Sequence, residues 1–300
     1  MMQRFPATGV LVLLMVSASA ISAQSFYNLR DGFLDRKGKF LSMKLQPVEE
    51  SDLTRTFDFL ITSTRDSMTG RIRYPKGPGP HPAAFLTVGI ETGKEVIEMI
   101  EGRENVILMA VDYPFEGEWN FGGLAAVGTT MRLRSMGFRT VPLLLNCLDW
   151  LFEQEAVKRD DVTLVAVSFG AFTGIPAAVF ETRVRRLVVI QAGGSLSTVI
   201  AHNAKRWGTT LPGWLAGWLG GALLAPFEPT KFIPHLAPRE LLMVNGKGDS
   251  FFPRESALAL LDAAQEPKEI IWHSSDHIMP GEKEMIKELT NLVAGRIYGD

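Results

Sequence analysis

The sequence predicts an α/β fold on a largely parallel sheet, from three observations. Short apolar runs rich in β-branched residues recur along the chain, and they suit strands that are buried on both faces. Segments with helical spacing separate several of these runs, and a strand–helix–strand order is typical of parallel βα units. The chain has 300 residues, of which 46% are hydrophobic and 21% are charged, so it can form one large domain or two small ones with a sizeable core.

The expected elements alternate along most of the chain. Strands are expected at 57–63, 70–74, 83–88, 106–111, 162–167, 187–191, 241–245 and 269–273. Helices are expected at 94–102, 141–152, 171–178, 254–264 and 281–296. Residues 24–55 are interpreted as a loosely structured lead-in that could hold one short helix, and residues 115–136 as irregular. A charged turn at 158–161 leads into the strand that follows it.

Residues 1–23 are interpreted as a secretory signal peptide rather than as part of the fold. Arg4 supplies a positive charge near the start, residues 10–16 form an apolar stretch, and small-residue cleavage sites follow it. The apolar stretch is much shorter than the ~20 residues that span a bilayer, so no stable membrane anchor is expected. We therefore expect an exported chain, periplasmic or secreted, whose domain covers residues 24–300.

Charge, cysteine and histidine content narrow the classes of function. The net charge is −2 and no dense run of Lys and Arg occurs, so no nucleic-acid partner is expected. The single cysteine, Cys147, excludes a disulfide within the chain and is expected to be a buried, inert thiol. The five histidines show no tight metal-ligand spacing, so neither a catalytic metal nor another cofactor is expected.

The most informative stretch is a strand that turns into a helix at a serine. The apolar strand at 162–167 is followed by Ser168, a phenylalanine and Gly170, and then by the small-residue helix at 171–178. This is the setting of a nucleophile elbow, where a sharp turn exposes the hydroxyl and the helix start favours an oxyanion. Ala166 stands where the usual pattern has its first glycine. The alternative is a plain strand–turn–helix with an incidental serine.

Three side chains form a candidate catalytic constellation. Ser168, Asp249 and His277 each follow the end of an expected strand, and in a parallel sheet those ends share one edge. A serine hydroxyl becomes nucleophilic when a base removes its proton, and imidazole, with a pKa near 6.5, can do so at neutral pH. A carboxylate on the other ring nitrogen fixes the tautomer and stabilises the imidazolium. Asp249 is favoured over Asp276 for this role, because adjacent residues of an extended segment point to opposite sides.

Residues 57–296 resemble the α/β-hydrolase superfamily, especially its dienelactone-hydrolase and acetyl-esterase-like branches. The resemblance is carried by 166–170, by Asp-Trp-Leu at 149–151, by 245–249 with Pro253, and by Asp276-His277 with Pro280, in the chain order of the superfamily. It implies a mostly parallel eight-stranded sheet and a serine acyl-hydrolase mechanism. No His-Gly-Gly follows the third strand, where Val88-Gly89-Ile90 stands instead. The backbone N–H groups of Phe169 and Ile90 are the resulting oxyanion-hole candidates.

Residues 195–240 interrupt the βα rhythm and are interpreted as a small helical cap. They include Trp207, Trp214 and Trp218 and an apolar, glycine-laced run. Trp214 and Trp218 are expected to line the substrate pocket, which would take an acyl or aryl group. A plain pair of packing helices and a segment lying on a membrane are the two alternatives.

Together these features predict an exported serine hydrolase, with a small-molecule ester or acyl compound as its substrate. Carboxylic ester hydrolysis is the favoured reaction. A serine peptidase or amidase is the nearest enzymatic alternative, and a catalytically inactive hydrolase-fold binding protein is the other. The sequence leaves the acyl length and the oligomeric state open.

Overall fold

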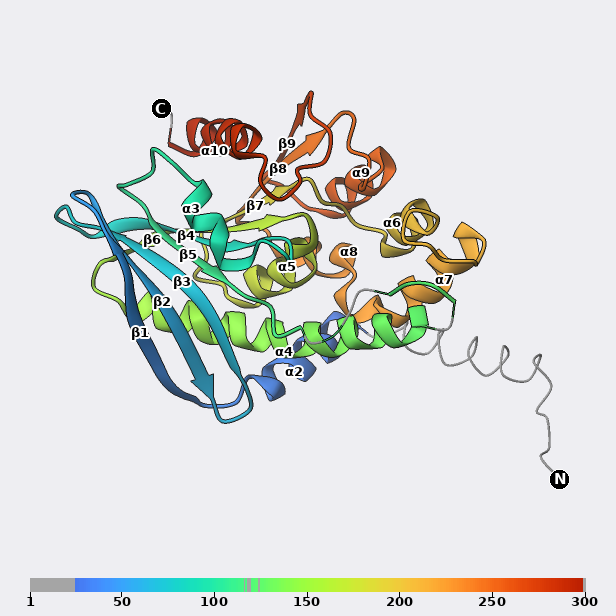
Figure 1. The fold of residues 1–300 in the computed structure, drawn as a ribbon, viewed down its shortest axis with the longest axis horizontal. Coiled ribbons are helices and arrows are strands. Elements are labelled where there is room, and N and C mark those ends of the chain that lie inside the picture. Colours follow the sequence, from blue (N-terminus) through green and yellow to red (C-terminus); the bar gives the residue numbers. More distant parts are fainter. Residues whose placement is uncertain (1–24, 116, 118–119, 124, 299–300) are drawn as a thin grey trace.

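The computed structural model describes residues 25–115, 117, 120–123 and 125–298, so the predicted signal peptide lies outside the described residues. The strands are β1 (Phe40–Glu50), β2 (Thr54–Ser63), β3 (Ser67–Pro75), β4 (His81–Thr87), β5 (Ile107–Val111), β6 (Val157–Val167), β7 (Arg186–Ile190), β8 (Glu240–Gly246) and β9 (Lys268–His273). They form one sheet in the order β1-β2-β3-β5-β4-β6-β7-β8-β9 (Figure 1).

Every strand pair from β5 to β9 is parallel, whereas β1, β2, β3 and β5 pair antiparallel. The predicted α/β class with a mostly parallel sheet is therefore confirmed. The sheet has nine strands rather than eight, because residues 40–50 add an edge strand.

The helices cover both faces of this sheet. They are α2 (Phe26–Lys37), α3 (Val96–Met99), α4 (Ala125–Glu153), α5 (Ala171–Phe180), α6 (Leu196–Asn203), α7 (Gly213–Leu223), α8 (Pro229–Phe232), α9 (Arg254–Ala263) and α10 (Lys283–Tyr298), with 3-10 turns η1 (Gly93–Glu95), η2 (Ser168–Gly170), η3 (Ala225–Phe227) and η4 (Ile233–His235). Within the described part of the chain, no helix is long and apolar enough to cross a membrane.

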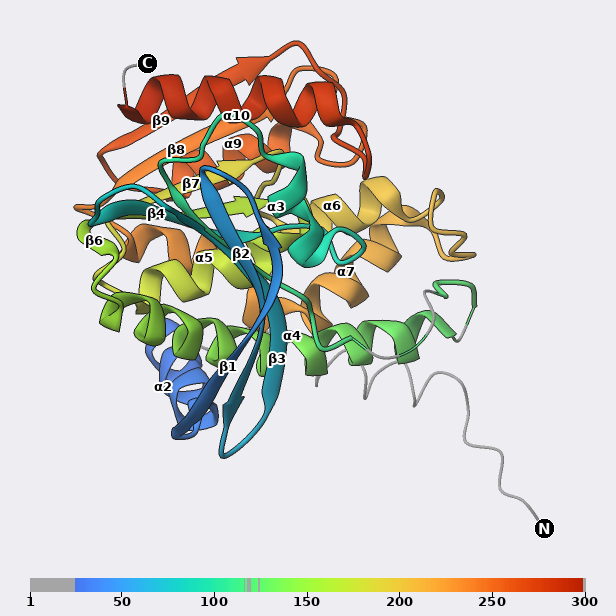
Figure 2. The same ribbon diagram turned by 60° about the vertical axis from the view of Figure 1, so that its left-hand side comes forward.

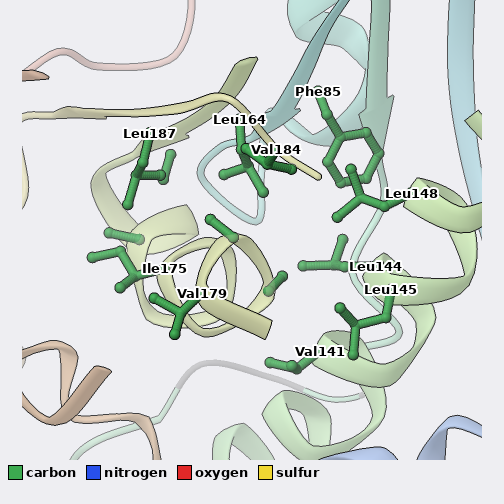
Figure 3. Close-up of a cluster of buried hydrophobic side chains, with 14 of the residues drawn as sticks. Phe85, Val141, Leu144, Leu145, Leu148, Leu164, Ile175, Val179, Val184 and Leu187 are labelled. Atoms are coloured by element: carbon green, nitrogen blue, oxygen red, sulfur yellow. The ribbon is translucent and has the colours of Figure 1, made fainter. Parts of the chain in front are cut away.

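Two apolar layers separate the sheet from its helices. On one face, Phe85 and Leu164 of the sheet pack against α4 and α5, as the close-up of this layer shows (Figure 3). On the other face, Leu86 and Val165 pack with residues of α3 and α10. Figure 2 shows these two helices over the sheet. Successive residues of β4 and β6 thus point into opposite layers, which is why these strands read as continuous apolar runs.

The expectation for residues 24–55 is right about one helix, which is α2, but wrong about a loose lead-in, because residues 40–50 form the strand β1. β1 pairs antiparallel with β2, from Phe40 opposite Ser63 to Glu50 opposite Arg55, and most of its side chains are exposed. Residues 41–46 alternate apolar and polar side chains, a period of two that is typical of a strand. The proline and acidic residues of the second half of β1 carry the opposite signal. Pro47 stands at a register shift of this edge strand, a position that tolerates proline.

Two further expectations need correction. Residues 125–136, expected to be irregular, are the first part of α4, although Gly128, Thr129 and Thr130 are poor helix formers. Tertiary contact overrides that propensity, since Thr129 is fully buried and its Oγ1 donates to the carbonyl of Asn120 at 2.6 Å. The charged residues 158–161, expected to form a turn, belong to β6.

Candidate active site

The nucleophile-elbow stretch forms the sharp turn that the sequence predicts. β6 ends at Val167, the 3-10 turn η2 holds Ser168, and α5 starts at Ala171. The φ of Ser168 is 52°, in the left-handed region that L-residues rarely adopt. Such strain persists where the surrounding structure fixes it, and it concentrates at functional sites.

Two glycines explain how this turn packs against β4. A Cβ atom built on Gly170 would lie 2.0 Å from the carbonyl oxygen of Thr87, so only glycine fits there. A Cβ atom built on Gly174 would lie 2.3 Å from Oγ1 of Thr87 and 3.0 Å from the methyl of Ala166. The missing side chain at Gly174 therefore leaves room for alanine at position 166.

The structure brings Ser168, His277 and Asp249 together at the carboxyl ends of the strands. Oγ of Ser168 lies 2.8 Å from Nε2 of His277, and Nδ1 of the same ring lies 3.1 Å from both carboxylate oxygens of Asp249. The side chains of His277 and Asp249 are 6% and 1% exposed. This is the order of contacts that a Ser–His–Asp triad requires.

The two carboxylates near His277 have different contacts. Oδ1 of Asp249 also accepts from the backbone amides of Phe251 and Phe252, at 2.9 and 2.8 Å, which fixes the carboxylate that faces the ring. Oδ1 of Asp276 accepts instead from the amides of Ser250 and His277, at 2.8 and 2.6 Å. The hydrogen bonds from the amides of His277 and Ser250 lower the pKa of Asp276. Asp276 thus links the loop after β8 to the loop after β9, and its carboxylate bonds the backbone of His277.

Gln191, which belongs to no predicted motif, holds the loop of His277 through three hydrogen bonds. Its side chain is fully buried, and its Nε2 donates to Oγ of Ser275 at 3.0 Å and to the carbonyl of Asp276 at 2.7 Å. Its Oε1 accepts from the amide of Ile278 at 2.5 Å. The φ of Gln191 is 46°, a second strained backbone position at the end of a strand. The sequence signal for this role is weak: an amide side chain that directly follows the apolar strand β7.

The two predicted oxyanion-hole residues line the same cavity as Ser168. Phe169 follows this serine in η2, and Ile90 lines the same cavity as Ser168 and His277. The loop that carries Ile90 is held by the hydroxyl of Tyr113, which donates to the carbonyl of Val88 at 2.8 Å. Burial raises the pKa of Tyr113, so this hydroxyl stays protonated and remains a donor. The donor role of the amides of Phe169 and Ile90 stays a prediction.

A cavity of about 920 Å³ opens at Ser168 and His277. One part of it, the cap arm, lies under α6, α7 and the first turns of α4, and is lined by residues that include Trp207, Leu219 and Leu223. The size is at the upper end of the range for small-molecule sites. Because the lining is mostly apolar, the cavity suits a hydrophobic group bound next to Ser168.

The expectation that Trp214 and Trp218 line this pocket is wrong. They are 73% and 37% exposed, and neither lies on the cavity wall. Helix α7 packs on α6 through its glycines: a Cβ atom on Gly217 would lie 2.4 Å from the carbonyl oxygen of Ser197. This contact turns the two tryptophans outward, and Trp207, stacked on Phe121 with ring centroids 5.3 Å apart, lines the cavity instead.

The remaining histidines lie away from the reacting atoms. His202 contacts the carbonyl of Ser250 at 3.0 Å, His235 stacks on Phe26, and His273 pairs with Glu288. Among the residues that the structure describes, no group of three or more His, Cys, Asp and Glu side chains is arranged to hold a metal ion.

Comparison with known proteins supports the same fold. The model of the FSH1 serine hydrolase family matches residues 188–289, a stretch that contains Asp249 and His277 and begins after Ser168. No curated protein sequence matches the chain.

Solved structures match over most of the chain. Acetyl xylan esterase 1 from Thermoanaerobacterium sp. JW/SL YS485 has a TM-score of 0.65 at 16% identity, over 88% of this chain and 92% of its own. The acetyl xylan esterase from Paenibacillus sp. R4 has a TM-score of 0.64 at 16% identity, over 89% and 93%. A 2,6-dihydroxy-pseudo-oxynicotine hydrolase has a TM-score of 0.56 at 19% identity, over 79% and 68%. These likenesses show that the chain shares the fold of these hydrolases.

Proposed function

We propose that this protein is a serine hydrolase that cleaves carboxylic esters of small molecules through an acyl-enzyme intermediate. The observation that carries the proposal is the continuous contact from Ser168 through His277 to Asp249, with distances of 2.8 and 3.1 Å. The strained φ of Ser168 supports it, because an ordinary strand–turn–helix has no need of left-handed backbone at a serine.

In the first half-reaction, Oγ of Ser168 attacks the ester carbonyl carbon while Nε2 of His277 takes the hydroxyl proton. Asp249 holds the other ring nitrogen and stabilises the imidazolium. The carbonyl oxygen becomes an oxyanion that accepts hydrogen bonds from the amides of Phe169 and Ile90. The tetrahedral intermediate then collapses, the C–O bond to the alcohol breaks, and His277 gives its proton to the leaving oxygen.

In the second half-reaction, water replaces the alcohol. His277 takes a proton from the water as its oxygen attacks the acyl carbon, and the proton returns to Oγ of Ser168 when the bond to serine breaks. The carboxylic acid leaves and the hydroxyl is restored. No cofactor enters these steps.

The character of the cavity favours esters over peptides. A peptide substrate carries an N–H and a C=O at each residue, and each of these groups must find a hydrogen-bond partner when it is buried. The wall of the cap arm consists mainly of apolar side chains such as Leu219 and Leu223. An ester with hydrocarbon groups on both sides can enter such a space with fewer unpaired polar atoms.

We also propose that the protein is exported, with the mature chain beginning near Gln24. The apolar stretch at 10–16 and the small residues after it support this assignment. N-terminal sequencing of the protein secreted or released from the periplasm would check it, and a chain that retains Met1 would contradict it.

A fluorophosphonate probe tests the nucleophile. The wild-type chain is expected to be labelled, and Ser168→Ala is expected to lose labelling and ester hydrolysis while keeping its circular dichroism spectrum. Ser197→Ala, on helix α6, is the matched control and should be labelled like wild type. Equal labelling of Ser168→Ala and wild type would overturn the assignment, and absence of labelling in a well-folded wild type would favour the inactive binding protein.

A further inference from the structure

The cavity at Ser168 has a second part, which runs away from the cap along the sheet. We call it the sheet arm. Its floor includes Leu86, Val165 and Ile190, and its roof includes Val96 of α3 and Leu289 and Val293 of α10. Figures 1 and 2 place α3 and α10 on the face of the sheet opposite to α4 and α5.

The burial of neighbouring strand residues shows independently that this arm penetrates the layer under α10. The floor residues Leu86, Val165 and Ile190 are 5%, 9% and 7% exposed. Their strand neighbours in the opposite layer are fully buried: Phe85, Leu164 and Val189. Protein interiors are normally packed without voids larger than a water molecule, so the accessible area on Leu86, Val165 and Ile190 agrees with a cavity that reaches this layer.

The sheet arm is long enough to hold an unbranched hydrocarbon chain of about ten carbon atoms. Its wall includes Val167, next to Ser168, and Thr163, farther back on the same strand. Four residue steps at ~3.3 Å each give about 13 Å. An extended chain advances ~1.2 Å per bond, as it does along the polypeptide backbone, so this length holds about ten carbon atoms.

The two arms differ in their access to solvent. The cap arm reaches the surface, because its wall includes Val127 and Leu211, which are 52% and 41% exposed. The sheet arm is more enclosed: Val165 and Val293 are 9% and 8% exposed, and Arg103, Thr290 and Ile297 on its wall are partly buried. In the acyl-enzyme mechanism the alcohol must leave while the acyl group stays on Ser168. The more open arm suits the departing group, and the more enclosed arm suits the group that stays.

We propose that the sheet arm holds the unbranched alkyl chain of the acyl group, so that the preferred substrates are esters of medium-chain fatty acids of about ten carbons. The proposal rests on the proposed serine hydrolase function, and it names the substrate class of that same site. Each methylene that leaves water for an apolar wall can improve binding by about fourfold.

The first test measures kcat/KM for 4-nitrophenyl esters of acetic, butyric, octanoic, decanoic and palmitic acids. Decanoate is expected to exceed acetate by at least about 100-fold, and palmitate to bring no further gain because its chain is longer than the arm. Val293→Phe fills the arm and should lower the decanoate-to-acetate ratio by at least about tenfold. Glu284→Phe, with the same new side chain at an exposed position of α10, is the control and should keep the wild-type ratio.

A second measurement does not depend on catalysis. Isothermal titration of Ser168→Ala with decanoate and with butyrate should show decanoate binding at least about tenfold tighter, and the added Val293→Phe change should abolish that difference. If Val293→Phe does not fold, Thr290→Phe on the same wall replaces it.

The outcomes separate the two proposals. A protein that hydrolyses acetate and decanoate equally, with no effect of Val293→Phe on the ratio, overturns the sheet-arm assignment and keeps the hydrolase. A protein that hydrolyses no ester but binds decanoate in a Val293-dependent way keeps the sheet arm and overturns the hydrolase.

Discussion

Oε1 of Gln191 accepts a hydrogen bond from the backbone amide of Ile278 at 2.5 Å, directly after His277 in the chain. The same side chain donates to the carbonyl of Asp276, directly before it. The buried side chain of Gln191 therefore holds the backbone directly before and directly after His277. Gln191 touches none of the reacting atoms, so we regard it as a positioning residue.

Gln191→Leu should lower kcat by about 10- to 100-fold with KM changed less than about threefold, because a loosened loop misplaces His277 without altering the apolar cavity. The change also leaves buried polar groups unpaired, which costs about 1–3 kcal/mol of stability for each group. Asn146→Leu is the control, since Asn146 is a buried amide on α4 that donates to the carbonyl of Lys37.

Steady-state kinetics and urea unfolding of both variants check this prediction. The control should lose stability and keep kcat per folded molecule. If Gln191→Leu loses stability but keeps its kcat, the residue is structural only.

Asp249→Asn should lower turnover far more than Asp276→Asn. The first change removes the charge beside Nδ1 of His277 and favours the wrong tautomer, which by analogy with serine proteases costs on the order of 10⁴-fold. The second keeps a carbonyl oxygen that can still accept from Ser250 and His277, so we expect a loss of less than about tenfold. Turnover of one activated ester by both variants, with folding checked by circular dichroism, decides the matter. A larger loss in Asp276→Asn would show that the wrong carboxylate has been assigned.

The tryptophans of residues 195–240 should differ in their effect on substrate preference. Trp207→Ala enlarges the cap arm and should change the relative rates for esters with small and bulky alcohol groups by at least about fivefold. Trp214→Ala and Trp218→Ala alter the outer face of α7 and should change these ratios by less than about twofold. A panel of alcohol-varied esters of one acid measures the ratios. An effect of Trp214→Ala as large as that of Trp207→Ala would contradict the observed orientation of α7.

Acid should weaken the attachment of the β2–β3 turn to α4. Arg139 of α4 donates through both Nε and Nη2 to the carboxylate of Asp66, and this hydrogen bonding lowers the pKa of Asp66 from its ordinary 3.8. A lowered folded-state pKa means that the stabilisation is complete above the unfolded-state value of 3.8 and is lost as the pH falls through the folded-state pKa. Since both side chains are partly exposed, the contribution is at most about 1 kcal/mol.

Urea unfolding between about pH 2 and pH 7 measures this contribution. The difference in unfolding free energy between wild type and Asp66→Asn should be largest near neutral pH and shrink below pH 3.8. Asp160→Asn, at an exposed position of β6, should show no such change. A difference between wild type and Asp66→Asn that stays constant with pH would contradict the role of the ion pair.

The sequence by itself determined the α/β class, the positions of the central strands, and the candidate residues Ser168, Asp249 and His277. Strands buried on both faces carry a strong local signal, and the ends of parallel strands share one edge, so chemically suited residues at those ends can be placed together without coordinates. The signal of the edge strand β1 is mixed: residues 41–46 alternate apolar and polar side chains, whereas Pro47, Glu49 and Glu50 are residues that strands disfavour.

Only the tertiary structure decided which side chains support and surround that constellation. Gln191 acts through a loop 87 residues later in the chain, and no local pattern records that contact. Helix α7 is apolar on every side, so its sequence does not reveal which face is turned inward. That choice is made by the close packing of Gly217 against Ser197, which points Trp214 and Trp218 to the surface. The sheet arm likewise depends on how far α3 and α10 stand from the sheet, a distance set by the packing of whole elements rather than by any one residue.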